Sequence, residues 1–297
     1  MLPIIGFIVV LASAVGGFMM AGGNPLLLWQ PVEFLIIFGV AIGALFIGFP
    51  AKKLQKMLLD FSKIFIGATY KKNDYLNMLV FLAAFLKVLK TKGFLAVEGH
   101  IEKPKDSELF LKFPKFIFDE PLLNFTQEYL RAISMGVENP YHLDEIITEE
   151  IRHLSNHYLK GSSKVFQSMA DSLPALGIVA AVLGVILAMA AIAEPPEILG
   201  HLIGAALVGT FLGVFASYGI VGPIGTHLAA INESDMHMYQ CIHQVLSSFL
   251  HGYPPSIAVE MGRKILPTNC RPTFEALENA ITSSSTQYAQ KSDEESG

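Results

Sequence analysis

Few residues of this chain have the types and spacing that catalysis or metal binding would require. Glu150 and His153 stand three residues apart and His157 follows one helical turn later, so one helical face could present all three to a metal ion. The sequence contains no second motif of this kind, no phosphate-binding glycine loop and no nucleophile elbow. The spacing is more typical of a solvated helix, so we expect no metal, no cofactor and no enzymatic activity.

A second set of polar residues lies within or beside long apolar segments. Thr210, Ser217 and Tyr218 lie inside such a segment, whereas Glu33 and Asp171 lie near segment ends, which leaves no ionisable residue mid-span. A proton path across a membrane normally contains an ionisable group. If this protein conducts protons, a partner must therefore supply the carboxylate. The Thr210 hydroxyl could line such a path or bond its own helix backbone.

Composition identifies the elements that must position these residues. The 297 residues are 52% hydrophobic and only 16% charged, which is too apolar for two soluble domains. A helix of roughly 20 apolar residues crosses the hydrocarbon layer and satisfies its own backbone hydrogen bonds there. We therefore predict an all-α integral membrane protein with four spans, at Leu2–Ala21, Val32–Phe49, Ser172–Ala193 and Leu199–Gly222.

The distribution of charge predicts the orientation of the spans. Lys and Arg are absent from Met1 to Ala51 and from Val165 to Gly262. Lysines follow the second span at once, at Lys52, Lys53, Lys56 and Lys63. Positive-inside bias then places the middle segment and both termini in the cytoplasm. Cys241 and Cys270 would be reduced packing residues there. The net charge of -5 and the lack of a basic stripe exclude a nucleic-acid binder.

The chain is predicted to alternate membrane and cytoplasmic parts. Helical periodicity from Leu76 to Lys90 ends at Gly93, Asn139-Pro140 opens a later helix, and Pro254-Pro255 ends the continuation of the fourth span. We predict five parts: a transmembrane hairpin at 1–50, a cytoplasmic helical domain at 51–170, a second transmembrane hairpin at 171–223, cytoplasmic C-terminal helices at 224–281 and a disordered tail at 282–297.

Small residues and prolines mark the spans. Glycine and alanine recur one turn apart, at Gly39 and Gly43, at Ala180, Gly184 and Ala188, and at Gly209 and Gly213. This spacing lets helix backbones approach closely, within the chain or against a partner helix. Pro174 and Pro223 stand at the cytoplasmic ends of the third and fourth spans. Each is either a hinge or an ordinary proline at a helix end.

Four stretches are similar to a known family. They are the Gly-Gly loop after the first span with Gln30-Pro31-Val32-Glu33, the run from Asp171 to Ala181, Val208 to Gly213, and Gly252 to Lys264. With two spans, a large loop and two further spans, the chain resembles the MotA family of flagellar stator proteins over nearly its full length. The family's close relatives ExbB and TolQ have a single span before the large loop, whereas this chain has two.

The resemblance implies a proton channel of the bacterial inner membrane that generates torque. It implies a homopentamer in the membrane lipid around two copies of a single-span partner, MotB, whose membrane Asp carries the ion. By the same resemblance, Thr210, Pro174 and Pro223 border the ion path and Asp171 lies at its cytoplasmic end. Sodium-driven relatives have a second Thr where this chain has Ala181, so the resemblance favours protons.

The resemblance also implies a contact with the rotor. Lys90 and Glu98 match a cation and an anion that face charged residues of the rotor protein FliG. The family's usual Arg is Lys here, so the contact loses the planar guanidinium and becomes more purely Coulombic and salt-sensitive. Without the resemblance, both residues would be read as part of a solvated helix surface.

Three alternatives to a flagellar stator subunit stay open. The first is an ExbB/TolQ-like proton channel that energises outer-membrane processes. The second is a membrane-embedded enzyme that uses the cluster of Glu150, His153 and His157. The third is a passive scaffold, which would not make cells permeable to protons when expressed with its partner.

Overall fold

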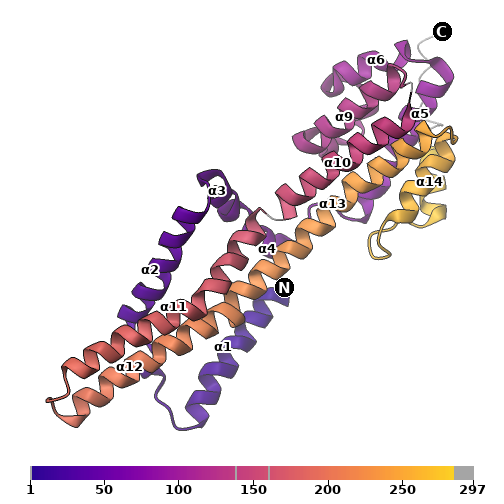
Figure 1. Cartoon of the computed structure of the whole chain (residues 1–297). Helices are drawn as coiled ribbons and strands as arrows, with labels where there is room; N and C mark the ends of the chain where they lie inside the picture. Colours follow the sequence, from indigo (N-terminus) through magenta and orange to yellow (C-terminus); the bar gives the residue numbers. More distant parts are fainter. Residues whose placement is uncertain (1, 138, 160, 284–297) are drawn as a thin grey trace. The chain divides into compact units, whose positions relative to one another are not determined.

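The computed structural model describes residues 2–137, 139–159 and 161–283, and this part of the chain is helical with no β-strand (Figure 1). The predicted all-α class is confirmed. The described chain forms two compact units. The first contains Met1–Gly67 and Asn156–Asn232, and the second contains Ala68–Ser155 and Glu233–Gly297.

Four helices of the first unit are long and apolar enough to cross a membrane, as predicted. They are α1 (Leu2–Met20), α2 (Pro31–Gly48) behind the short helix η1 (Pro25–Leu28), α11 (Ser162–Ala190) and α12 (Pro196–Phe215). α11 begins at Ser162 instead of Ser172, because Val165 and Phe166 extend its buried face beyond the purely apolar run. The predicted boundary at 170/171 therefore lies inside a continuous helix.

The fourth span continues without a break. α12 passes through a π-helical segment, η3 (Ala216–Val221), into α13 (Gly222–Leu250). The predicted continuation of the fourth span is confirmed, since α13 runs to Leu250 and ends before Pro254 and Pro255. The predicted boundary at 223/224 also lies inside a helix.

Small residues join α11 to α12. A Cβ atom built on Gly184 would lie 2.7 Å from the Ala206 Cβ, and one built on Gly209 would lie 3.2 Å from the Ala180 Cβ. The first distance leaves no room for a Cβ atom and the second is tighter than an ordinary contact, so the predicted close packing of these two spans is confirmed within the chain. α2 adds Ile37 and Ala41 to the same apolar core.

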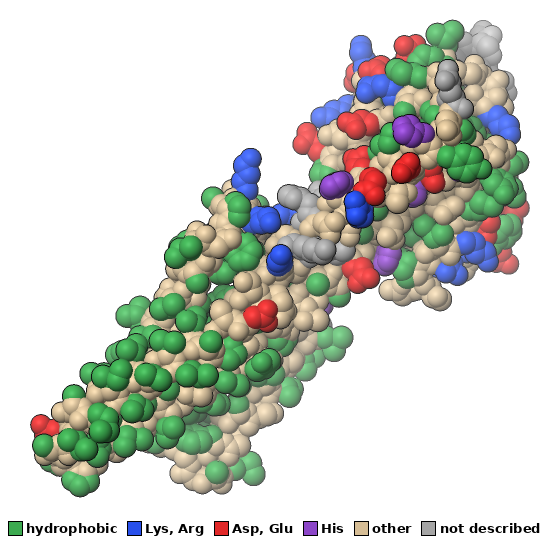
Figure 2. All heavy atoms as spheres, viewed as in Figure 1, with side chains coloured by type: hydrophobic (Ala, Val, Ile, Leu, Met, Phe, Trp, Pro, Cys, Tyr) green, Lys and Arg blue, Asp and Glu red, His purple; other side chains and the backbone are tan. Residues whose placement is uncertain are grey.

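Other surfaces of the spans stay open in the single chain. No residue of α1 is buried, and Gly43 of α2 has no heavy atom within 4 Å of a built Cβ. The predicted close packing at Gly39 and Gly43 therefore does not occur within this chain, because that face of α2 points away from α11 and α12. A groove of about 690 Å³ lies between α1, η1 and α12. Figure 2 shows apolar side chains over these helices, as lipid-facing spans require.

Two short helices follow the second span in the first unit. They are α3 (Ala51–Asp60) and α4 (Lys63–Ile66). Asp60 is buried, and its Oδ2 accepts a hydrogen bond of 2.6 Å from the Ser162 hydroxyl. Met57 packs against the apolar core of the first unit, which includes Phe166 of α11. These contacts attach α3 to the first turns of α11.

The second unit packs short helices around α5. Its helices are α5 (Lys72–Lys92), α6 (Leu95–Glu102), η2 (Pro104–Asp106), α7 (Glu108–Leu111), α8 (Pro114–Phe118), α9 (Glu120–Ser134), most of α10 (Pro140–Leu159), the end of α13, α14 (Pro255–Ile265) and a last helix at 274–283. α5 ends at Gly93, whose φ of 77° suits glycine, and Pro140 opens α10, so both predictions are confirmed. The core of the second unit includes the fully buried side chains of Tyr75, Phe81 and Phe110.

The C-terminal tail differs in part from its prediction. Thr282 and Ser283 belong to the last helix, where their hydroxyls bond to the carbonyl oxygens of Glu278 and Asn279. The prediction of disorder from Thr282 onward is therefore wrong for these two residues, because their hydroxyls bond to backbone carbonyl oxygens of the preceding helical turn. The rest of the predicted tail lies outside the described residues.

Candidate functional site

Two predicted ion-path residues lie together at the contact between α11 and α12. A Cβ atom built on Gly209 would lie 3.5 Å from the backbone nitrogen of Ala181. Thr210 follows Gly209, and its carbonyl oxygen would lie 3.3 Å from a Cβ on Gly177. Ala181 and Thr210 are both half-buried. The backbones of Ala181 and Thr210 therefore both belong to the close contact between these two spans.

Pro174 lies inside α11 and not at its end. A proline has no N–H, so the carbonyl oxygen of Ala170, four residues earlier, loses its usual helical donor. The Ser217 hydroxyl of η3 donates to this oxygen at 2.6 Å, in a buried position. The backbone group that the proline leaves unpaired is satisfied by the neighbouring helix, which is how membrane helices tolerate prolines.

Pro223 lies where η3 passes into α13 and is exposed. Gly222 donates its N–H to the carbonyl oxygen of Ser217, five residues earlier, so the helix is widened there. Pro174 and Pro223 are therefore both inside continuous helical runs. The interpretation as ordinary helix-end prolines is wrong for both. α11 begins at Ser162, twelve residues before Pro174, and α13 continues α12 through η3, so Pro223 is not at a helix end.

Glu33 lies deeper in the first unit than its sequence position indicated. It belongs to the first turn of α2, but its side chain is buried, and its Cγ would lie 3.5 Å from a Cβ on Gly209. The start of one span therefore lies beside an inner turn of another, which no count along the sequence predicts. The prediction that Glu33 lies near a span end is confirmed, whereas its burial against Gly209 was not predicted. One signal was available, since Glu33 is the only acidic residue before Asp60.

Asp171 is exposed on α11 and accepts a hydrogen bond of 2.9 Å from the Gln167 side chain. In the described part of the chain Asp171 forms no hydrogen bond or ion pair with Thr210 or Ala181. Asp171 lies one turn before Pro174, and its exposed side chain is on the side of α11 that faces away from the core.

The predicted rotor-contact charges lie in the second unit. Lys90 occupies the last turn of α5 and Glu98 the first turn of α6, with Gly93 between the two helices. Both side chains are exposed, and neither forms an ion pair with another described residue. Both charges are therefore available to an external partner.

The described residues do not support the metal site. Glu150 accepts a hydrogen bond from the Tyr129 hydroxyl, and His153 is exposed. The side chain of His157 lies outside the described residues. Among described residues, no three histidine, cysteine or acidic side chains gather as a metal site would require.

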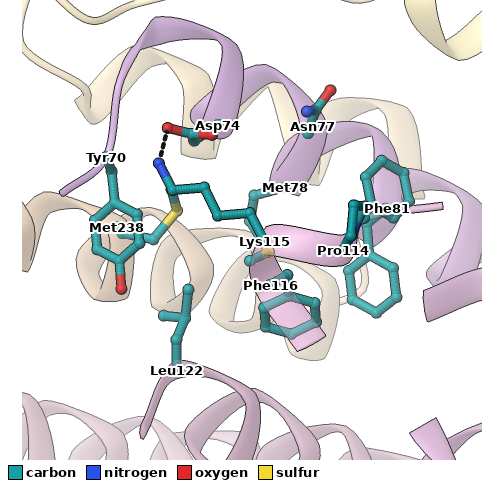
Figure 3. Close-up of a pocket in the computed structure, with 11 residues that line it drawn as sticks. Tyr70, Asp74, Asn77, Met78, Phe81, Pro114, Lys115, Phe116, Leu122 and Met238 are labelled. Atoms are coloured by element: carbon teal, nitrogen blue, oxygen red, sulfur yellow. Dashed lines mark hydrogen bonds and ion pairs between the residues drawn. The ribbon is translucent and has the colours of Figure 1, made fainter. Parts of the chain in front are cut away.

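Figure 3 shows a cavity of about 110 Å³ in the second unit. Apolar groups such as Met78, Phe81 and Leu122 form most of its lining, and the Lys115 ammonium meets the Asp74 carboxylate at 2.5 Å beside it. Tyr70 also lines the cavity and donates to Asp119, and burial raises the pKa of its phenol. These polar groups are already paired with one another, so the cavity has the character of a packing feature.

The chain is similar to known proteins in both sequence and fold. Residues 4–93 match the motility protein A N-terminal family, and residues 118–240 match the MotA/TolQ/ExbB proton channel family. Motility protein A of Salmonella typhimurium is 37% identical over 99% of this chain and 100% of its own length. Chemotaxis protein LafT of Vibrio parahaemolyticus is 34% identical over 92% of this chain and 96% of its own.

Two solved structures share the fold. The structure of C. jejuni MotAB matches with a TM-score of 0.71 and 20% identity, covering 91% of this chain and 98% of that one. The flagellar MotAB stator complex from Bacillus subtilis matches with a TM-score of 0.68 and 24% identity, covering 89% and 95%. The fold, with four helices long and apolar enough to cross a membrane, thus defines a multi-pass helical membrane protein. The chain belongs to the MotA/TolQ/ExbB proton channel family, in its motility protein A branch.

Proposed function

We propose that this chain is the channel-forming subunit of a flagellar stator, which converts the proton motive force into torque on the rotor. The observation that carries the proposal is the position of Ala181 and Thr210 beside Gly209, within stretches that resemble motility protein A, which the chain matches over its full length. The ExbB/TolQ-like alternative is less favoured, because the chain has two spans before its large helical segment.

The ion-carrying group comes from a partner in this proposal. The apolar parts of α11 and α12, at residues 172–190 and 202–215, contain no ionisable residue, which leaves Glu33 as the buried carboxylate at this site. A single-span MotB-type partner would supply a membrane Asp that faces Thr210, Pro174 and Pro223. The open faces of α1 and α2 suit further copies of this chain, which form a homopentamer around the partner.

The transported ion is the proton in this proposal. Ala181 has no hydroxyl where sodium-driven relatives have a second Thr, so the site offers one oxygen ligand fewer for Na⁺. Both termini and the second unit then lie in the cytoplasm, in keeping with the lysines after α2. There the exposed charges of Lys90 and Glu98 meet the rotor protein FliG.

A motility test decides between these functions. The chain is expressed with its MotB-type partner in a strain that lacks its own stator subunits, and swimming is followed in soft agar and in tethered cells. We expect rotation that stops with a protonophore and is indifferent to sodium. A sodium requirement would contradict the choice of ion, and absence of rotation with a stable complex would contradict the stator function.

Two further controls separate the remaining alternatives. Co-expression with the partner makes cells permeable to protons if the pair forms a channel, whereas a passive scaffold leaves permeability unchanged. Replacing His153 and His157 by Ala leaves swimming intact if the chain has no metal-dependent activity, and it abolishes activity if the enzyme reading is right.

A further inference from the structure

The helices that follow α2 present large apolar side chains outside the spans. Leu58 and Leu59 of α3 are 70% and 68% exposed, and Phe65 and Ile66 of α4 are 56% and 74% exposed. With the exposed Lys52 and Lys53 they form what we call the α3–α4 surface. Large apolar side chains exposed in adjacent pairs on two consecutive helices are characteristic of a contact with a partner or a membrane.

The α3–α4 surface is positively charged. Residues 51–67 contain four lysines and a single acidic residue, Asp60. Asp60 is buried, bonded to Ser162 and 3.6 Å from the Lys63 ammonium, so it does not offset the lysines at the surface. Lys52 and Lys53 form no ion pair with another described residue. The surface therefore complements a negatively charged ligand.

The position of α3 sets the depth of this surface. α2 ends at Gly48, and Pro50 caps α3 two residues later. The contacts of α3 with Ser162 and of Met57 with the Phe166 cluster place it beside the first turns of α11, before the purely apolar part of that helix begins at Ser172. Figure 2 shows basic side chains over α3, next to the apolar surface of the spans. This level corresponds to the border between hydrocarbon and headgroups.

We propose that the α3–α4 surface binds anionic phospholipids in the membrane leaflet that it borders. Leu58, Leu59, Phe65 and Ile66 insert among the upper parts of the acyl chains, as the apolar face of an interfacial helix does. Lys52 and Lys53 extend their ammonium groups to the lipid phosphates. This binding is independent of the proposed stator function, since it uses none of the ion-path or rotor-contact residues.

A single tryptophan tests the proposal on the full-length chain. The sequence has one tryptophan, Trp29, so Trp29→Phe with Phe65→Trp leaves one fluorophore in α4. This protein is reconstituted in phosphatidylcholine vesicles that contain brominated phosphatidylglycerol or, in parallel, brominated phosphatidylcholine. Bromine quenches only a tryptophan that it touches, so the two series report the relative affinity of the surface for the two headgroups.

We expect phosphatidylglycerol to be preferred by roughly fivefold or more, and the preference to fall at high salt. Lys52→Gln with Lys53→Gln should lower the ratio to near one, whereas Lys52→Arg with Lys53→Arg should keep it. The matched pair Lys71→Gln with Lys72→Gln, exposed in the second unit, should leave it unchanged. Circular dichroism and the elution volume of each variant verify that it is folded.

Three results would overturn the proposal. Absence of quenching by either lipid would show that the surface is covered by protein, as it would be by a second copy of this chain. Equal quenching by both lipids would show an apolar anchor without choice of headgroup. A preference that survives Lys52→Gln with Lys53→Gln would show that other groups select the lipid.

Discussion

The hydroxyl of Ser217 donates a hydrogen bond to the carbonyl oxygen of Ala170, the group that Pro174 leaves without its helical donor. The two residues belong to different helices, so the bond connects η3 to α11 beside the proposed ion path. Ser217→Ala should therefore leave a buried carbonyl unsatisfied at a cost of about 1–3 kcal/mol. Denaturant titration of the protein in detergent micelles measures this loss.

A double-mutant cycle separates this bond from simple packing. Pro174→Ala restores an N–H that can bond to Ala170, so Ser217→Ala should cost much less in the Pro174→Ala background than in the parent. Equal costs in the two backgrounds would mean that Ser217 does not act through the carbonyl freed by Pro174.

The contact of α11 with α12 tolerates no side chain at Gly213. A Cβ atom there would lie 2.6 Å from the Leu173 carbonyl oxygen and 2.7 Å from the Gly177 Cα. Gly213→Ala should separate the two helices, lower stability by about 1–3 kcal/mol and impair swimming. Gly204→Ala in the same helix meets no atom within 4 Å and should do neither. Similar behaviour of the two variants in thermal unfolding would contradict the close contact.

Glu33 carries a carboxylate into a site lined by Gly209 and Ala180. A buried ionisable group in a membrane costs free energy and is retained where it has a function. Glu33→Gln should therefore stabilise the isolated chain in detergent but slow the rotation of tethered cells, with Glu33→Asp intermediate. Unchanged rotation in Glu33→Gln would assign this residue to packing alone.

The exposed charge of Lys90 should act in the rotor contact and not in folding. Lys90→Glu reverses a charge that has no ion-pair partner among described residues, so membrane insertion and thermal stability should stay within about 0.5 kcal/mol of the parent. Torque in tethered cells should fall strongly. Lys92→Glu, two residues further along the same helix and equally exposed, is the matched control. Normal torque in Lys90→Glu would remove Lys90 from the rotor contact.

The buried guanidinium of Arg263 predicts a pH dependence in the second unit. Its hydrogen bonds to Glu260 lower the pKa of that carboxyl, and Arg263 also donates to the Pro272 carbonyl oxygen at 2.9 Å. A depressed folded-state pKa contributes stability above the unfolded value, about 4.3, and this stability is lost as the pH falls through the folded value. Glu260→Gln should cost about 3 kcal/mol at pH 7, and the cost should fall as the pH is lowered to 3, below the unfolded value.

Hydrogen exchange of the α14 amides at the two pH values measures this cost. The exposed pair of Glu149 and Arg152 has the same spacing along its helix, so Glu149→Gln should cost less than about 1 kcal/mol at either pH. A loss in Glu260→Gln that does not depend on pH would mean that the charge of the carboxylate is not what stabilises Arg263.

The sequence predicts those features that depend on local order. Runs of apolar residues predicted the four spans, and glycine and proline predicted the end of α5 at Gly93 and the start of α10 at Pro140. These signals act within one helix or one turn. They also predicted that Gly184 and Gly209 lie where helices approach closely.

Features that depend on how helices are shifted along one another could not be predicted. The burial of Glu33 against Gly209 requires the start of α2 to lie beside an inner turn of α12. The partner of Ala170 is likewise 47 residues away in sequence, at Ser217. The periodicity of a single segment predicts neither contact, because each contact results from packing between segments.

The absence of any buried residue in α1 affects how its sequence should be interpreted. Substitutions in a buried helix are limited by the volume of its own core, whereas those in α1 are limited by whatever fills the groove beside α12 and covers its outer face. Variation in α1 among related chains therefore reflects their surroundings, lipid or neighbouring subunit. A suppressor mutation found in α1 would accordingly identify a contact outside this polypeptide.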